Sequence, residues 1–196
     1  MKIYDISQEV FGCEVYPGDP APKREVLASI SEGSLYNLTA FSMCAHNGTH
    51  LDAPKHFLRD GASIESISLE KTVGDAFVAE CRGRLSAQDA EDLLKRAERA
   101  GASARRVLLK GGTVGEEAAR VFAAYGLDLL GTETQSVAAV EETAAVHRIL
   151  LESDILLLEG IRLGAVSEGG YFLSAAPLSL EGADGAPVRA VLIDFL

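Results

Sequence analysis

The sequence predicts an α/β protein with a mixed β-sheet, folded as a single domain over residues 1–196. In the middle of the chain, strand and helix patterns alternate three times, which is typical of parallel strands joined by helices. At both ends, strand patterns follow one another without intervening helices, which favours antiparallel pairing. A mixed sheet satisfies both observations. A chain of 196 residues, 47% of them hydrophobic, can bury one sizeable core, so no second domain is needed.

The N-terminal part is predicted to contain strands and loops. Alternating apolar and polar residues predict a strand over 2–7, and a loop follows over 12–22, where prolines and glycine disfavour helix and sheet. Two further strands are expected over 24–30 and 35–44, joined by a short polar turn. Tyr16 lies at the tip of the loop and is either part of a substrate lid or a plain surface aromatic; the composition favours neither.

The helices are expected in the middle of the chain. Residues 86–100 form the clearest one, because Ser86 is a good N-cap, acidic residues occupy the first turns and basic residues the last. The glycine-rich segment 111–115 lacks the spacing of phosphate-binding loops, so it is interpreted as a turn. The other expected elements are a helical turn at 64–67, strands at 75–81, 106–110, 127–130, 155–158, 171–180 and 188–195, and helices at 116–125 and 141–153.

The composition argues against several classes of partner. With a formal net charge of −11, the chain would repel phosphate backbones and anionic membrane surfaces, so nucleic acid and membrane partners are not expected. A small-molecule substrate or a protein partner remains. The three cysteines have no C-x-x-C spacing and are expected to be reduced and buried. Residues 1–5 are charged and alternating rather than apolar, and no apolar run is long enough to span a membrane, so a cytoplasmic protein is expected. Cys44 precedes a histidine-rich stretch and is either a thiolate nucleophile or, as we favour, a small apolar strand residue.

One short stretch holds three of the four histidines of the chain together with an aspartate. The spacing is H-x3-H-x-D-x3-H, from His46 through His50 and Asp52 to His56. In an extended segment His50 and Asp52 lie on one face, and the intervening Asn-Gly turn can bring His46 beside them. Two imidazoles and a carboxylate leave coordination positions open for water and substrate, which indicates a catalytic Zn2+ or Mn2+ site. Adventitious metal binding by a histidine-rich loop is the alternative.

Asp52 has two oxygens and can bridge a second ion, for which His147 and Glu159 are the candidate ligands. Glu159 ends an aliphatic strand, where a carboxylate is costly unless it is paired or metal-bound. Taken singly, each residue also fits a structural role, as a strand-end charge that reaches water or a locally hydrogen-bonded helix histidine. His56 is either a further ligand or, as we favour, a general acid and base near neutral pH.

The segment H-N-G-T-H-L-D-A-P-K-H-F at 46–57 resembles the H-x-G-T-H-x-D-x-P-x-H-F signature of the cyclase family of metal-dependent hydrolases, which includes bacterial kynurenine formamidase and isatin hydrolase. The resemblance extends over nearly the whole chain, through the segments 16–20, 147–151, 158–160, 176–178 and 184–190. It implies a swivelling β/β/α-type fold and a homodimer or larger homo-oligomer, in which the partner chain helps to close the active site.

The resemblance also implies roles for individual residues. His46, His50 and Asp52 match the first metal site, His147 and Glu159 match the second with Asp52 as the bridge, and His56 matches the catalytic acid and base, so two ions per subunit are expected. Tyr16 stands where the formamidases carry a tryptophan that contacts substrate, and it can stack on an aromatic ring. Residues 133–138 read E-T-Q-S-V-A in place of D-T-P-S-V-D.

These observations predict a hydrolase of an amide, lactam or lactone that uses a metal-bound hydroxide as nucleophile and resembles arylformamidases. His56 would accept a proton and return it to the leaving group. The alternative, from a different class, is a metal-stabilised binding or scaffold protein that has kept the fold without turnover.

Overall fold

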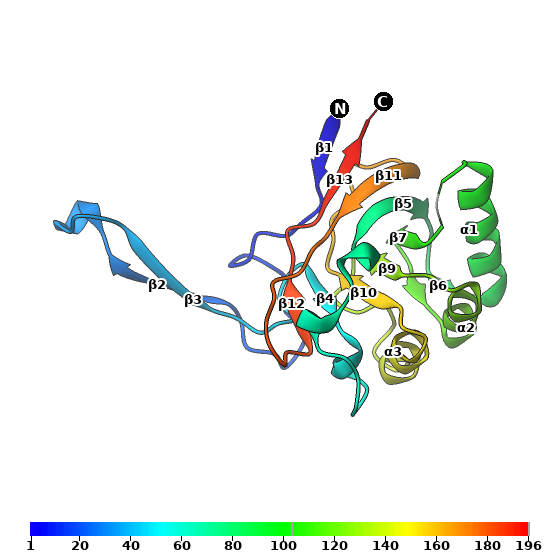
Figure 1. Cartoon of the computed structure of the whole chain (residues 1–196), viewed down its shortest axis with the longest axis horizontal. Helices are drawn as coiled ribbons and strands as arrows, with labels where there is room; N and C mark the ends of the chain where they lie inside the picture. Colours follow the sequence, from blue (N-terminus) through cyan, green and yellow to red (C-terminus); the bar gives the residue numbers. More distant parts are fainter. Residues whose placement is uncertain (103, 196) are drawn as a thin grey trace.

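The computed structural model describes residues 1–102 and 104–195, which are built around a nine-stranded mixed sheet (Figure 1). The strands lie in the order β1-β13-β11-β5-β7-β9-β10-β4-β12. Neighbours among β5, β7, β9 and β10 are parallel, and the strands on either side pair antiparallel. The members are β1 (Lys2–Asp5), β4 (His50–Asp52), β5 (Val73–Glu80), β7 (Arg106–Lys110), β9 (Leu129–Thr132), β10 (Leu156–Glu159), β11 (Gly169–Ser174), β12 (Gly185–Pro187) and β13 (Val191–Asp194). The predicted α/β class with a mixed sheet is confirmed.

Three helices connect the parallel strands and cover one face of the sheet (Figure 1). They are α1 (Ala87–Arg99), α2 (Glu116–Tyr125) and α3 (Thr143–Glu152), close to the predicted ranges. The parallel strands are added in one direction across the sheet, so right-handed crossovers place all three helices on the same side. Ser86 caps α1 as expected, in a reciprocal capping box with Asp89.

The sheet separates two hydrophobic cores, because strand side chains alternate between its faces. On β5, Phe77 and Ala79 pack on the helix side together with Phe122 of α2. Ala76 and Val78 lie on the opposite side, which the loops and outer strands cover. All five of these side chains are almost completely buried. The central strands are therefore apolar on both faces, as their continuous hydrophobic sequences predicted.

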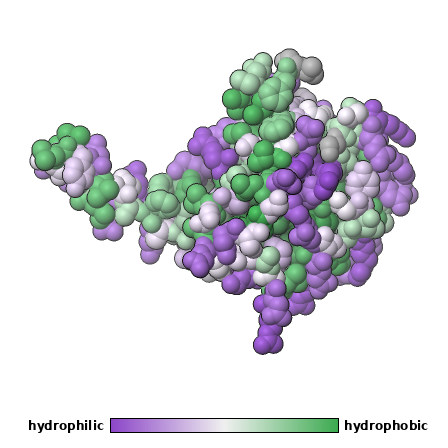
Figure 2. Space-filling view, viewed as in Figure 1, coloured by the Kyte–Doolittle hydropathy of each residue, from purple (hydrophilic) through white to green (hydrophobic). Residues whose placement is uncertain are grey.

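A long hairpin extends from the body of the molecule (Figure 1). It is formed by β2 (Lys23–Ala28) and β3 (Leu38–Ser42), which pair antiparallel, with the 3-10 turn Ile30–Glu32 near its tip. We call residues 23–42 the arm. Large hydrophobic side chains on the arm are exposed, which Figure 2 shows as green patches, and they are Val26, Leu27, Ile30, Leu35, Tyr36, Leu38 and Phe41. A two-stranded hairpin with this surface is marginally stable alone in water.

The structure differs from the sequence prediction around β4. None of the strands expected from the sequence includes His50–Asp52, but these residues form a strand between β10 and β12. Its second partner, β12, lies between the strands expected over 171–180 and 188–195. The strand expected over 171–180 ends at Ser174. Three-residue strands that pair only with distant segments have no local alternation to reveal them, which explains these errors.

The remaining elements are short. β6 (Arg84–Leu85) and β8 (Thr113–Val114) form a parallel two-stranded sheet. The glycine-rich segment at 111–115, predicted to be a turn, therefore contains a short strand. Further 3-10 turns occur at Pro54–His56, Ile64–Ser66 and Leu69–Lys71. Within the described ranges 1–102 and 104–195, every helix is too short or too polar to cross a membrane.

Candidate metal centre and active site

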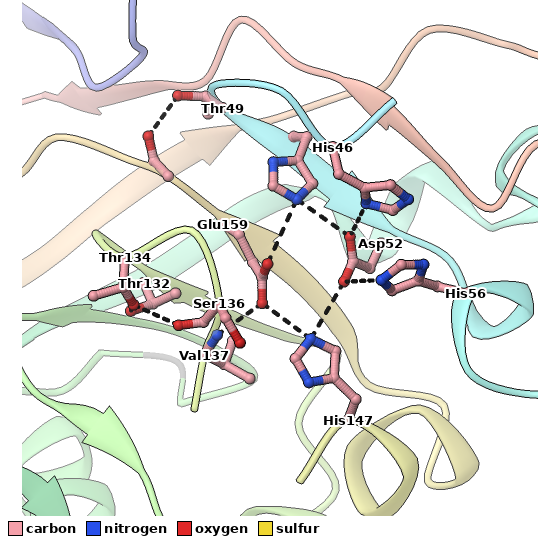
Figure 3. A network of polar contacts seen from close by, with 12 residues as sticks. His46, Thr49, Asp52, His56, Thr132, Thr134, Ser136, Val137, His147 and Glu159 are labelled. Atoms are coloured by element: carbon pink, nitrogen blue, oxygen red, sulfur yellow. Dashed lines mark hydrogen bonds and ion pairs between the residues drawn. The ribbon is translucent and has the colours of Figure 1, made fainter. Parts of the chain in front are cut away.

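The centre is assembled by the pairing of β4 with β10. Directly opposed residues of paired strands share a face, and Glu159 lies opposite His50. Asp52 is two residues beyond His50 and therefore points to the same face, whereas Leu51 points into the core on the other side. Helix α3 covers the face with the three polar side chains and brings His147 to them (Figure 3). The fold thus joins residues that lie about a hundred positions apart.

Asp52 is completely buried at the middle of this group. His50 Nε2 lies 3.4 Å from Asp52 Oδ1 and 3.5 Å from Glu159 Oε2. His147 Nε2 lies 3.6 Å from Asp52 Oδ2 and 3.3 Å from Glu159 Oε1. His46 Nδ1 lies 2.8 Å from Asp52 Oδ1. Glu159 is 3% exposed, so a strand-end charge that reaches water does not describe it.

The nitrogen of each ring that faces away from the centre is held by a hydrogen bond. Nδ1 of His50 donates to the Gly48 carbonyl at 3.0 Å, and Nδ1 of His147 donates to the Thr143 carbonyl at 2.8 Å. A carbonyl oxygen can only accept, so the proton of each ring is fixed on Nδ1 and Nε2 faces the carboxylates. Bonds of this kind orient the imidazoles of metal sites.

The loop after β9 positions Glu159 from the other side. The Val137 backbone N–H donates to Glu159 Oε1 at 2.8 Å (Figure 3). Hydrogen bonds between Thr132, Thr134 and Ser136 hold this loop together. Gly160, which follows Glu159, has φ of +69°, and a Cβ there would lie 2.3 Å from the Gly48 carbonyl oxygen. A glycine is therefore required at the end of β10 for the strand to approach the histidine turn.

The buried carboxylates and histidines of the centre strongly shift one another's pKa values. Burial lowers the pKa of His46 and of His147, but contacts with Asp52 outweigh this effect and raise both to about 10. Burial raises the pKa of Asp52, while His147 and His46 lower it well below its usual range. Without a metal the buried carboxylates are thus neutralised by protons on the histidines. A divalent cation would replace these protons, and its binding would release them.

The residues fit a divalent metal ion. Asp52 Oδ2 is buried and has no hydrogen-bond partner among the described residues, although a buried carboxylate oxygen is normally satisfied. Donor atoms lie within 4.8 Å of one another in two groups that share Asp52; these are His46, Asp52 and His56, and His50, Asp52 and Glu159. Imidazole and carboxylate donors without a thiolate suit Zn2+ or Mn2+. The sequence assigned the ligands to two sites differently, although Asp52 is shared in both schemes.

His56 lies at the edge of the centre. Its Nε2 is 3.9 Å from Asp52 Oδ2, and its ring stacks on that of His46, with 4.0 Å between the ring centroids. The side chain is 27% exposed, in contrast to the buried His50 and His147. His56 therefore lies between the buried carboxylates and the space in front of them.

A cavity of about 400 Å³ opens in front of the centre. Tyr16 lies on its wall, and Phe57 supplies a second aromatic ring. Cys44 also lines the cavity, with its Sγ 3.9 Å from Asp19 Oδ2. The other lining residues are His46, His50, His56, Gln135, Ser136, Thr143, His147, Glu159 and Asp184.

Two residues of the cavity were not identified from the sequence. Asp184 contacts both His46 and His56, at 3.0 and 3.2 Å. The side-chain oxygen and nitrogen of Gln135 are buried without hydrogen-bond partners among the described residues. The available signals were the D-G-A-P-V-R segment at 184–189 and the substitution of glutamine for proline at position 135, both within the resemblance to the cyclase family.

Comparisons with known proteins identify the family of the chain. The Cyclase family model matches residues 4–139. Kynurenine formamidase from Erythrobacter litoralis is 34% identical over 206 residues, which cover 97% of this chain and 93% of the relative. A predicted metal-dependent hydrolase from Bacillus stearothermophilus has a similar structure, with a TM-score of 0.80, 29% identity and 97% of both chains covered. Isatin hydrolase A from Labrenzia aggregata shares the fold, with a TM-score of 0.83, 21% identity and coverage of 97% and 93%. The chain therefore belongs to the cyclase family, and its relatives place it among the hydrolases of carbon–nitrogen bonds other than peptide bonds.

Proposed function

We propose that the protein is a metal-dependent hydrolase of the arylformamidase type, which cleaves the amide, lactam or lactone bond of a small molecule. The observation that carries this proposal is the buried carboxylate of Asp52 at the base of a cavity of about 400 Å³. Histidines surround it, and its Oδ2 has no hydrogen bond among the described residues. The kynurenine formamidase relative supports an aryl formamide such as N-formylkynurenine as the substrate class.

The proposed ligands are His46, His50, Asp52, His147 and Glu159, which would hold two Zn2+ or Mn2+ ions with Asp52 between them. Bound there, the metal lowers the pKa of a water molecule towards about 7 and polarises a carbonyl oxygen. The protein contributes the fixed orientation of the imidazoles, through the carbonyls of Gly48 and Thr143. It also keeps bulk water away from the buried carboxylates.

His56 is proposed to move the proton. Its Nε2 would accept the proton that the attacking water loses, as oxygen bonds to the carbonyl carbon. It would then donate this proton to the leaving nitrogen or oxygen, as the bond to the carbonyl carbon breaks. The partly exposed position of His56, between Asp52 and the cavity, allows contact with both the water and the leaving group.

The cavity also suggests how substrate is held. Tyr16 and Phe57 offer aromatic surface for a planar ring, and Ser136 and Thr143 offer hydroxyl groups. We propose that Tyr16 contacts the aryl group by stacking. The glutamine at position 135 adds an amide that the D-T-P-S-V-D pattern lacks, so the preferred substrate can differ from that of the relatives.

Turnover of a small panel tests this function. Purified protein should be assayed with N-formylkynurenine, formanilides, isatin and small lactones, in the presence of Zn2+ or Mn2+. At least one compound should be hydrolysed, a chelator should stop the reaction, and added metal should restore it. Stoichiometric metal without any turnover would favour the binding or scaffold protein, whereas less than one tightly bound ion per chain would contradict both functions.

We also propose a cytoplasmic location. Cys13, Cys44 and Cys81 are free thiols at half-buried positions. Thiols persist where the compartment is reducing, whereas secreted proteins of modest size commonly use their cysteines in disulfides. Cell fractionation with an antibody against the protein would test this location, and recovery in the secreted or periplasmic fraction would contradict it.

We also propose that the protein forms a homodimer, because the arm exposes large apolar side chains. Leu35, at the tip of the arm, is 96% exposed, and Ile30 and Tyr36 beside it are each 59% exposed. An apolar groove of about 640 Å³ lies at the base of the arm, where Phe11 and Leu178 form part of its wall. Contiguous exposed apolar surface of this kind marks interaction sites. We infer that the arm tip of one protomer occupies this groove on a second copy, and that two-fold symmetry repeats the contact.

A substitution at the tip of the arm should dissociate the proposed dimer. Leu35→Glu places a charge at the centre of the inferred contact and should convert the dimer to a monomer in size-exclusion chromatography with light scattering. Leu69→Glu is a matched control, because Leu69 is 57% exposed and lies outside the arm. This control should remain dimeric. A monomeric wild-type protein, or a Leu35→Glu variant that dimerises as tightly as wild type, would contradict the inferred interface.

A further inference from the structure

Asp184 is held beside the metal centre by the backbone of β12. The next residue, Gly185, pairs with Asp52 in the ladder between β12 and β4. The carbonyl of Asp184 accepts a hydrogen bond from the Ala53 N–H at 2.9 Å. A Cβ at Gly185 would lie 2.7 Å from Cε1 of His46, so this glycine allows the His46 ring to approach. The position of the Asp184 side chain is thus set by the same short strand that carries Asp52.

The carboxylate of Asp184 contacts two histidines with a single oxygen. Oδ2 lies 3.0 Å from His46 Nε2 and 3.2 Å from His56 Nδ1. The two rings are stacked, with an angle of 28° between their planes, so both can direct an N–H edge towards one acceptor. The outer ring nitrogens of His50 and His147 donate to backbone carbonyls. Among the described residues, Asp184 is therefore the one carboxylate that binds the outer nitrogens of two histidines.

These contacts decide which nitrogen of each ring is free. An ionised carboxylate only accepts hydrogen bonds, so the protons lie on His46 Nε2 and His56 Nδ1. His46 Nδ1 faces Asp52 Oδ1 at 2.8 Å, so it also carries a proton while no metal is bound. A metal ion would displace this inner proton and leave Nδ1 as the free nitrogen, because the outer proton is held by Asp184. The free nitrogen of His56 is Nε2, 3.9 Å from Asp52 Oδ2. With the opposite tautomers, neither ring would offer a lone pair to the centre.

We propose that Asp184 is a positioning residue that sets the ring orientation and the tautomer of both His46 and His56. It would thereby couple a metal ligand and the proton carrier through one carboxylate. The inference rests on the proposed function for the roles of these two histidines, but the tautomers themselves can be tested independently of turnover. Carboxylates that accept from the outer nitrogen of a ligand histidine typically change metal affinity by about 10–100-fold when they are replaced.

The decisive variant is Asp184→Asn. It keeps the shape of the side chain but replaces one acceptor oxygen by an NH2 group, which can only donate hydrogen bonds. In the Zn2+-loaded protein, two-bond 1H–15N spectra report the tautomer of each ring, and the chain has only four histidines to assign. Wild type should show His46 as the Nε2–H and His56 as the Nδ1–H form. In Asp184→Asn, the His56 signal should lose its pure Nδ1–H character.

Metal affinity and kinetics give two further readouts. Asp184→Asn should weaken Zn2+ binding by about 10–100-fold and lower kcat by a similar factor, with KM changed less than about 2-fold. Asp184→Glu should recover part of both losses, because it restores an acceptor. Glu181→Gln removes one negative charge from the same loop at an exposed residue outside the cavity and should behave like wild type.

The outcomes separate this inference from the proposed function. An unchanged His56 tautomer together with unchanged Zn2+ affinity in Asp184→Asn would overturn the positioning role. Complete loss of metal from both Asp184→Asn and Asp184→Glu would also overturn it, because Asp184 would then be a ligand itself. If no compound of the panel is turned over, the proposed function fails, while the spectra and the Zn2+ titrations still decide the role of Asp184.

Discussion

Replacing Asp52 by asparagine should remove tightly bound metal and lower turnover by about 10³-fold or more. Asp52 is completely buried and belongs to both groups of candidate donor atoms. An asparagine has the same shape but lacks the negative charge and one acceptor oxygen. Loss of the metal removes several kcal/mol of transition-state stabilisation, and each 1.36 kcal/mol corresponds to a factor of ten in rate. Metal analysis after dialysis and initial rates with the best substrate of the panel measure both effects.

Asp128→Asn is the matched control for this variant. Asp128 is also buried, at 7% exposed, but it pairs with Arg105 and Arg106 away from the centre. This control should retain the metal content of wild type, and circular dichroism should show that both variants are folded. If Asp52→Asn binds as much metal as wild type, Asp52 does not bridge the ions, and the arrangement proposed for the centre is wrong.

Replacing His56 by glutamine should lower kcat by about 10²–10⁴-fold and leave the metal content intact. The magnitude is that of a lost general acid and base, because glutamine cannot carry a proton at neutral pH. The position of His56 at the edge of the centre, 27% exposed, is the structural reason to expect catalysis without a contribution to metal retention. Metal analysis and steady-state kinetics on the same sample provide the measurement.

The same substitution at His147 provides the comparison. His147 is 2% exposed and its Nε2 lies between Asp52 and Glu159, so His147→Gln should lose metal as well as activity. Loss of metal from His56→Gln would instead make His56 a ligand. That result would favour the donor group of His46, Asp52 and His56 over the grouping implied by the family signature. The pair of variants therefore decides between the two schemes.

Formation of the proposed dimer would fix part of the cavity wall in place. Cys44 follows the arm directly, and Asp19 and Tyr16 lie just before it, and all three line the cavity. An arm fixed on a partner would hold both ends of this wall in place. The turnover of the monomeric Leu35→Glu variant would therefore show how far the cavity depends on the second copy.

The sequence by itself determined the class of fold and most of the centre. Alternating strand and helix patterns with adjacent strands at the ends predicted a mixed sheet, and the helix at 86–100 was predicted from its capping residues. The spacing of His46, His50 and Asp52 placed three donors within reach of one another, because that geometry depends only on local backbone conformation. Local patterns of this kind can be read directly from neighbouring residues.

Only the tertiary structure shows how the distant residues meet at the centre. Glu159 meets His50 because β10 pairs with β4 in one register, and Asp184 reaches His46 and His56 because β12 adds to the other edge of β4. Strand register depends on contacts between segments far apart in the chain, and three-residue strands carry no periodic signal of their own. The sequence predicted Asp52 as a shared ligand with His147 and Glu159 as distant partners, whereas the carboxylate of Asp184 became visible only when the sheet was assembled.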